Sequence, residues 1–185
     1  MTDSSSIMAP LSLCGERHHD GIYASVSRLE DRAAIEDLVL KYFLAADDDD
    51  WETLGASFAE DGSFSAGAFP GGDDRESVVK FIQADRQNMG VTVHTQNTTL
   101  LTFTDDDHAD GVVGAHLELA RGGTTVYGAV RYYDTYVRTA EGWQIKTREM
   151  AIIHVGPWDE VGTSLTAPNR ARWPGADPAP ADLPR

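Results

Sequence analysis

The chain has 185 residues, a length that suits one domain with ordinary ends. Hydrophobic residues make up 41% of it, which is enough for a core and argues against global disorder. Its 30 acidic and 15 basic residues give a formal net charge of −15. That balance argues against nucleic acid or an anionic membrane as a partner, because phosphate binding needs clustered Lys and Arg.

The sequence carries few signs of targeting or of redox chemistry. The single cysteine, Cys14, cannot form an internal disulfide and belongs to no Cys/His pattern, so we interpret it as a bystander thiol. No stretch approaches the roughly 18 apolar residues that a membrane span requires. The first residues also make a poor signal peptide, and we therefore expect a cytoplasmic protein.

Composition divides the chain into three parts. Residues 1–22 show no sustained hydrophobic period, and we expect a flexible N-terminal arm. Residues 23–160 carry the periodic segments of the folded domain. Residues 161–185 end in a run rich in Pro and Ala, which we expect to form neither helix nor ladder and to be anchored by Trp173.

The first predicted helix starts near Ser27, where Ser27 and Glu30 fit a capping box. Its apolar residues follow 3.6-residue spacing: Ile35, Leu38, Val39, Tyr42 and Ala46. The helix ends at Asp47, the first of four consecutive aspartates. We expect Asp48 to Asp50 to lie at the surface or to cap the next helix.

Two more helices are predicted before the pattern changes. Residues 50–61 form a short second helix that Gly62 breaks. Residues 73–90 form a third helix, with Asp73 or Asp74 as its cap and Gly90 as its stop.

The second half of the chain is predicted to be a sheet. Residues 91–104, 111–119, 124–138 and 142–155 are rich in Val, Thr, Ile and Tyr. Short turns separate the later strands, which is typical of an antiparallel meander, and residues 62–69 add a short early strand. Helices followed by such a sheet predict an α+β fold with the helices on one face.

This layout resembles the SnoaL-like, scytalone dehydratase-like branch of the nuclear transport factor 2-like superfamily, over about residues 28–156. Three segments carry the resemblance: "RAAIEDLVLKYFLAADDDDWETLGASFAEDGSF", "TVHTQNTTL" and "VRYYDTYVRTAEGWQIKTREM". It implies a cone-shaped α+β barrel, in which three N-terminal helices pack on a curved antiparallel sheet. The cone encloses a deep and mostly apolar pocket, the usual form of a small-molecule site.

The resemblance also implies a chemistry. In the dehydratase and dehydrochlorinase branch, an aspartate at the end of the first helix pairs with a histidine from the sheet, and these correspond to Asp47 and His94. We therefore expect a cofactor-independent lyase, with dehydration as the first choice, acting on a small apolar aromatic or cyclic substrate. His94 would be the base, oriented by Asp47. We expect no metal, since the aspartate run lacks the alternating ligands of a calcium loop.

Seven further residues are predicted to bind the substrate. The resemblance implies Arg138 as a residue that faces the site, and a Tyr or Arg there would stabilise developing negative charge. His116 either lines the pocket or faces outward, and Tyr42 would position the substrate or a water. The complete set is Tyr42, Trp51, Phe64, His116, Tyr133, Arg138 and Met150.

Three alternatives stay open. A ketosteroid isomerase-like enzyme would use a lone carboxylate base, and a polyketide-type cyclase would use the same cone for ring closure. A non-catalytic protein would only bind a small ligand there. We expect a homodimer or a homotrimer, because this fold often pairs through the outer face of its sheet.

Overall fold

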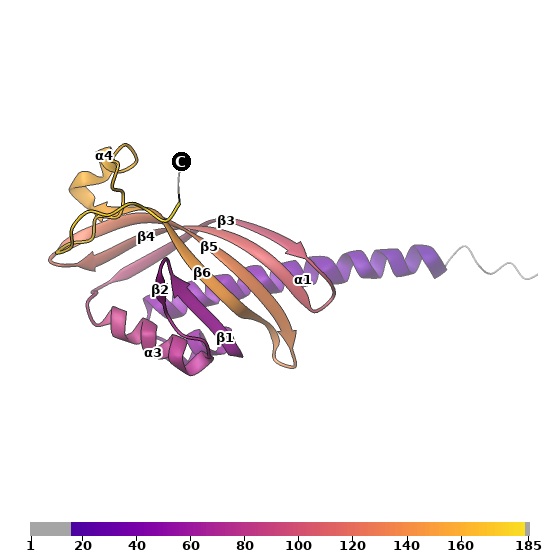
Figure 1. The fold of residues 1–185 in the computed structure, drawn as a ribbon. Coiled ribbons are helices and arrows are strands. Elements are labelled where there is room, and N and C mark those ends of the chain that lie inside the picture. The colour runs from indigo at the N-terminus through magenta and orange to yellow at the C-terminus, as the bar shows by residue number, and fades with distance from the viewer. Residues whose placement is uncertain (1–15, 184–185) are drawn as a thin grey trace, which may run out of the picture.

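The structure, a computed structural model, describes residues 16–183, without the side chains of residues 16–22 and 24. The long N-terminal helix runs behind an open, curved sheet (Figure 1). In chain order the elements are α1 (Glu16–Asp47), α2 (Trp51–Ala56), β1 (Phe58–Ala66), β2 (Phe69–Pro70), α3 (Arg75–Arg86), β3 (Thr92–Phe103), β4 (His108–Arg121), β5 (Thr124–Thr139), β6 (Gly142–Pro157), a 3-10 turn (Trp158–Glu160) and α4 (Val161–Ser164).

The six strands lie in the order β2-β1-β6-β5-β4-β3. β3 to β6 form the predicted antiparallel meander, which is confirmed. The sheet is not antiparallel throughout, because β1 lies parallel to β6, with Phe64 opposite Arg148. A parallel pair needs a long crossover, and here α3 and the whole meander supply it. Helices followed by this curved sheet confirm the predicted α+β fold.

α1 begins at Glu16 and not near Ser27, so the predicted capping box is wrong and Ser27 lies inside the helix. The first half of α1 extends beyond the sheet (Figure 1). Of its described side chains, Tyr23, Val26 and Leu29 are apolar and exposed. Exposed apolar residues of this kind give no hydrophobic period from which to predict a helix. Cys14 lies outside the described residues.

The second predicted helix is half wrong, while the third is confirmed. α2 ends at Ala56, and the chain turns into β1 at Phe58, which pairs with Ile145 of β6. Pairing with a strand far along the sequence overrides local helix preference here. α3 has the predicted cap, since the Ser77 N–H donates to the Asp74 carboxylate at 2.7 Å.

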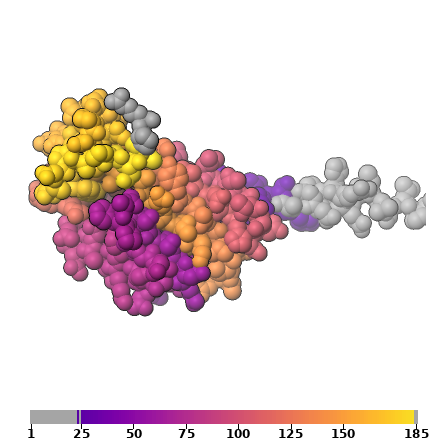
Figure 2. Space-filling view, in the orientation of Figure 1, coloured from indigo at the N-terminus to yellow at the C-terminus, as the bar shows by residue number. Residues whose placement is uncertain are grey.

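The C-terminal residues are folded onto the sheet. After α4, the chain runs along the last part of β6 and forms two isolated bridges, Val155 to Ala171 and Ala171 to Ala179. Figure 2 shows these residues as a continuous layer of atoms at one end of the molecule. The expectation that this proline-rich stretch forms no ladder therefore holds only in part, because single bridges suffice to dock it.

A buried ion pair lies at the centre of the core. The Arg148 guanidinium donates to both oxygens of Asp134, at 2.9 and 2.7 Å, and both side chains are inaccessible to solvent. The Tyr136 hydroxyl donates to the same carboxylate at 2.6 Å. Two-point bonding of this kind fixes the plane of the guanidinium, so the sheet presents it in one orientation.

That guanidinium packs α1 on the sheet. Its carbon lies 4.3 Å from the ring centre of Tyr42 and 5.7 Å from that of Phe43, both on α1. On the sheet side it lies 4.8 Å from the ring of Tyr132. A desolvated cation over aromatic faces attracts them by about 2 kcal/mol. The contact fixes the helix against β5 and β6.

Removing one partner of the ion pair should lower the free energy of unfolding more than removing both partners does. Asp134→Leu leaves Arg148 charged and unpaired, which should lower the free energy of unfolding by about 3–5 kcal/mol. The double variant Asp134→Leu with Arg148→Met removes both charges and should recover most of that loss. Urea unfolding of the three proteins measures the difference, and a double variant no more stable than the single one would contradict this account.

Candidate active site

Asp47 and His94 meet where α1 ends beside β3. The Asp47 Oδ1 lies 2.6 Å from the His94 Nδ1. The two side chains are only 13% and 17% exposed, so the contact is largely shielded from water. They stand 47 residues apart in the sequence, and the fold brings them together.

Two further donors hold the Asp47 carboxylate. The His94 backbone N–H donates to Oδ2 at 2.8 Å, and the Thr92 hydroxyl donates to Oδ1 at 2.8 Å. β3 is the last strand of the sheet, so an N–H on its free side lacks a neighbouring strand. Asp47 therefore satisfies an edge-strand donor with the same carboxylate that orients the imidazole.

The environment keeps Asp47 ionised. Burial acts against the charged form, but the hydrogen bond and charge of His94 outweigh it. The bonds from the His94 N–H and from Thr92 act in the same direction, and together they hold the pKa of Asp47 below its ordinary value. With Asp47 ionised, Nδ1 of His94 carries the proton of this contact, so Nε2 is the ring nitrogen that holds the lone pair in the neutral imidazole.

Phe43 fixes the plane of the imidazole. Its ring stacks on His94 with 5.1 Å between ring centres and 11° between planes. Phe43 precedes Asp47 by about one helical turn, so both side chains come from one side of α1. None of the hydrogen bonds among the described groups involves Nε2, which leaves it available to a substrate.

The other three aspartates of the run lie at the surface, where each has different contacts. Asp50 caps α2, where its carboxylate accepts from the Thr53 N–H at 3.1 Å. Asp49 has a positive φ of 58° and lies 2.8 Å from the Arg86 Nε. Asp48 is exposed. Their predicted place at the surface and at a cap is confirmed, and Asp47 alone points inward.

Four of the predicted substrate-binding residues pack on the same side of the sheet as the pair. Phe64 is buried, while Trp51 and Met150 are partly buried and pack against the core. Tyr42 is buried beneath the Arg148 guanidinium, and desolvation raises the pKa of its hydroxyl. This side of the sheet is therefore largely aromatic and apolar, with the Arg148 guanidinium beside Tyr42.

The side chains of the other three do not point toward the pair. Tyr133 lies on the outer face, because it alternates with the buried Tyr132 and Asp134. His116 also faces outward and packs on Tyr127, with 5.4 Å between ring centres.

Arg138 lies at the far end of β5 and is used otherwise. Its Nη2 lies 2.6 Å from the Asp31 carboxylate, and its guanidinium carbon lies 4.5 Å from the Trp143 ring. Asp31 also accepts from the Trp143 indole N–H at 3.1 Å. The assignment of Arg138 to the site is not supported by this position. Of the arginines on the concave side, Arg148 is the one that is fully buried.

Sequence reasoning missed Arg148, Thr92 and Phe43. Thr92 stands two residues before His94 in one strand, so strand alternation could have found it. Phe43 stands four residues before Asp47, and helix spacing could have found it too. Arg148 could not be placed, because the sequence does not tell which face of β6 is concave.

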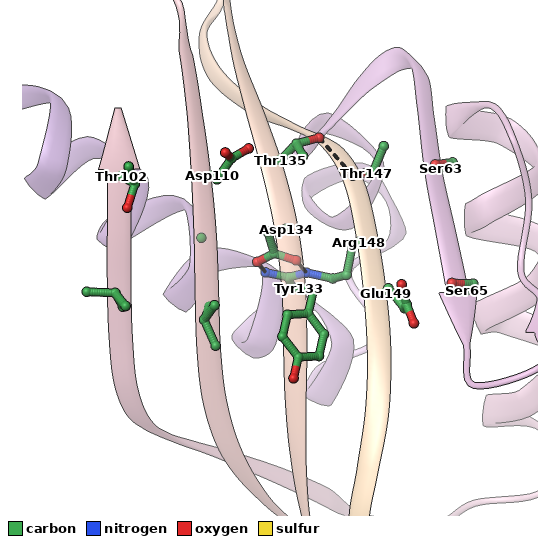
Figure 3. Close-up of a pocket in the computed structure, with 13 residues that line it drawn as sticks. Ser63, Ser65, Thr102, Asp110, Tyr133, Asp134, Thr135, Thr147, Arg148 and Glu149 are labelled. Carbon is green, nitrogen blue, oxygen red and sulfur yellow. Dashed lines mark hydrogen bonds and ion pairs between the residues drawn. The ribbon is translucent and has the colours of Figure 1, made fainter. Parts of the chain in front are cut away.

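A groove of about 470 Å³ lies on the opposite, outer face of the sheet. Figure 3 looks onto it, with α1 behind the strands. Its polar lining residues carry mainly hydroxyl groups, together with three carboxylates and one guanidinium: Ser63, Ser65, Thr102, Asp110, Tyr133, Asp134, Thr135, Thr147, Arg148 and Glu149. It contains no histidine and no Asp–His contact, so the Asp47–His94 pair is the better candidate for catalysis.

Comparison with known families agrees with this architecture. The model of the SnoaL-like domain matches residues 27–149, more than half of the chain. The chain belongs to the SnoaL-like domain family. A search of curated proteins gave no match.

Solved structures similar to this SnoaL-like protein share its fold. A candidate scytalone dehydratase from Novosphingobium aromaticivorans matches with a TM-score of 0.68 at 19% identity, over 83% of this chain and 99% of that one. A hexachlorocyclohexane dehydrochlorinase, LinA-type3 from Novosphingobium barchaimii, gives 0.68 at 18% identity, over 74% and 96%. A nuclear transport factor 2-like protein with a cystatin-like fold, also from N. aromaticivorans, gives 0.60 at 26% identity, over 71% and 88%.

No three or more His, Cys, Asp or Glu side chains cluster closely enough to hold a metal ion within the part of this SnoaL-like protein that the structure describes. None of the helices among residues 16–183 is long and apolar enough to cross a membrane.

The stability of this SnoaL-like domain should carry a signature of Asp47 at acidic pH. The pKa of Asp47 is lower in the folded than in the unfolded chain, so the unfolded chain binds more protons. The contribution of Asp47 is therefore complete above about pH 4 and is lost as the pH falls through the folded pKa. Urea unfolding between about pH 3 and pH 7 measures this. The free energy of unfolding of Asp47→Asn should fall less steeply with decreasing pH than that of the wild type.

Asp48→Asn is the matched control, because it removes the neighbouring carboxylate from an exposed position. It should keep the wild-type pH dependence. An equal change in both variants would show that the run acts only through its summed charge.

Proposed function

We propose that the protein is a cofactor-independent lyase that removes a proton from carbon and expels a leaving group, with dehydration as the first choice. The single observation that carries this proposal is the 2.6 Å contact between the Asp47 carboxylate and the His94 imidazole. The SnoaL-like family and the fold shared with a candidate dehydratase and a dehydrochlorinase support it.

His94 is the base in this mechanism. Its Nε2 takes a proton from a carbon next to a carbonyl group, and the imidazole becomes an imidazolium. Asp47 stabilises that cation, since its charge lies against Nδ1. The electrons of the broken C–H bond form the new C=C bond as the neighbouring C–O bond breaks. The hydroxyl leaves with the proton from Nε2, so water is released and His94 returns to its neutral form.

The interior has one more group suited to this chemistry. Nη1 of Arg148 is buried and has no hydrogen-bond partner among the described residues. A buried donor without a partner is costly, and a substrate oxygen would satisfy it. Developing negative charge on a carbonyl oxygen is stabilised by such a donor. Tyr42, packed under the same guanidinium, would position the substrate.

The substrate class follows from the apolar side chains on the same side of the sheet as the pair. Phe43, Phe64, Trp51 and Met150 present aromatic and apolar surface. Such walls bind flat apolar rings and offer little to a charged or strongly polar substrate. We propose a small aromatic or cyclic β-hydroxy ketone as the substrate type.

A ketosteroid isomerase-like reaction is less well supported. It would need a carboxylate free to take a proton from carbon. Asp47 accepts from the Thr92 hydroxyl and from two donors of His94, and its pKa lies below the ordinary value. A carboxylate held in this way is a weak base.

The proposal is tested with a panel of cyclic and aromatic β-hydroxy ketones, followed by the ultraviolet absorbance of the conjugated product. His94→Ala should lower kcat/KM by about 10²–10⁴, the usual contribution of a general base. Asp47→Asn should lower it as well, because the imidazolium loses its partner. The free energy of unfolding of both variants is measured alongside.

The chain offers a matched control in its second Asp–His contact. His108 lies 3.0 Å from Asp105 in the β3–β4 turn, where both side chains are more than half exposed. His108→Ala should leave turnover unchanged. The lyase assignment fails if His94→Ala retains full activity, or if it loses activity only in proportion to its stability. Binding of the ketones without any turnover would instead support the non-catalytic protein.

A further inference from the structure

The C-terminal residues 158–183 pack along an edge that the rest of the sheet leaves open. β1 follows β6 only as far as the Ala66–Met150 pair, so the later residues of β6 have no neighbouring strand on that side. The C-terminal stretch takes that place. The Val155 N–H donates to the Arg170 carbonyl at 2.8 Å, and the Arg172 N–H donates to the Val155 carbonyl at 2.9 Å.

A second anchor lies nearer the end of the chain. The Asp182 carboxylate accepts from the Ile152 N–H at 2.8 Å, and the Leu183 N–H donates to the Ile152 carbonyl at 3.2 Å. Arg170 joins the two anchors, since its side chain donates to the carbonyls of Ile153 and Leu183. The stretch between them is thereby held in one place.

This docking inserts Trp173 into a small apolar cluster. The cluster is formed by the buried side chains of Leu119, Val126 and Val155, and Trp173 packs against it together with Met89 and Ile152. Leu119 and Val126 alternate with the exposed or outward residues of β4 and β5, so the cluster lies on the concave face. Trp173 therefore covers the concave face and not the outer one.

The strand register places this cluster next to the catalytic pair. Leu119 pairs with Thr92, whose hydroxyl donates to Asp47, and Leu117 pairs with His94 itself. The row of paired residues that starts at His94 on β3 crosses the sheet through Leu117 on β4 and Gly128 on β5 to Val155 on β6. The cluster under Trp173 thus meets the row of His94 at Val155, three strands from His94, and the next row toward the end of the sheet at Leu119 and Val126.

Two charged residues fix the indole. The Arg121 guanidinium carbon lies 5.1 Å from the Trp173 ring centre. The same guanidinium lies 3.3 Å from the Asp85 carboxylate at the end of α3. An arginine between a carboxylate and an aromatic face restricts both, so α3 and β4 together position Trp173.

We propose that Trp173 is a specificity-determining residue, which closes the end of the concave face beyond His94 and selects flat, unsaturated ring substrates. The inference rests on the proposed function for the chemistry at His94. An indole that is fixed in position by an arginine and an apolar cluster can stack on planar rings, and it excludes bulky, saturated ones. Trp173 lies outside residues 27–149, which match the SnoaL-like domain.

The test measures the accessibility of His94 without any turnover. Diethyl pyrocarbonate modifies neutral imidazole, and mass spectrometry of the digested full-length protein gives a rate for each histidine. Trp173→Ala should raise the rate at His94 severalfold, since it removes the cover from that end of the face, while the exposed His108 should keep its rate. Trp173→Phe should restore part of the protection.

Trp158→Ala is the matched control. Trp158 belongs to the same C-terminal stretch but packs edge-on against Tyr127 of the outer face, with 5.6 Å between ring centres. It should leave the His94 rate unchanged. An unchanged His94 rate in Trp173→Ala, or an equal rise in both variants, would overturn the proposal. An equal rise would mean that the whole stretch loosens.

The second readout is the protection of His94 from modification by a bound ligand. The two ligands compared are the planar 2-naphthol and the saturated decalin-2-ol. In the wild type, 2-naphthol should protect His94 from modification better than decalin-2-ol does. Trp173→Ala should lose that preference, and an unchanged preference would contradict the selectivity. Because modification needs no catalysis, these readouts remain valid if the ketone panel shows no turnover, and the two proposals fail separately.

Discussion

The guanidinium of Arg148 is the constraint on which the rest of the molecule depends. It is fully buried, so its charge must be matched inside the protein, and Asp134 does so with two parallel bonds. The fixed plane then packs against Tyr42 and Phe43 of α1. A helix held by a rigid, flat group cannot slide along the sheet without losing that contact. The place along the sheet at which α1 ends, and so the position of Asp47, therefore depends on the charge of Arg148.

Asp47 shows how position alone distinguishes chemically identical groups. Four aspartates follow one another, and each one ionises by itself in water near neutral pH. Only the first lies within reach of three donors, the Thr92 hydroxyl and the backbone and ring nitrogens of His94. Those donors outweigh the cost of burial, and the carboxylate keeps the charge that an imidazolium needs beside it. The next residues turn away through a left-handed conformation at Asp49, which takes the remaining charges to the surface.

The sequence predicts what is local, and it fails where contacts between distant residues decide. Helical spacing and strand alternation locate α3 and the meander, because each depends on neighbours a few residues away. The inward role of Asp47 was implied by the resemblance to the SnoaL-like family. The parallel pairing of β1 with β6 depends on a partner more than 80 residues later, and it converts half of a predicted helix into strand. Alternation also divides β5 into two faces without telling which face is concave. For that reason Tyr133 was placed at the site and Arg148 was not.

The two halves of the proposed activity place different demands on the chain. Proton transfer needs atoms held within fractions of an ångström, and rigid elements provide this: a helix end, an edge strand and a stacked ring. Choosing among substrates needs only a surface that fits some rings better than others, which is worth about 1–3 kcal/mol. Such a surface can come from a segment that packs on the sheet without forming one of its strands. Trp173 is docked in that way, through the open edge of β6 and the guanidinium of Arg121. The base can therefore stay unchanged while the C-terminal residues vary, so the range of substrates can change without rebuilding the Asp47–His94 pair.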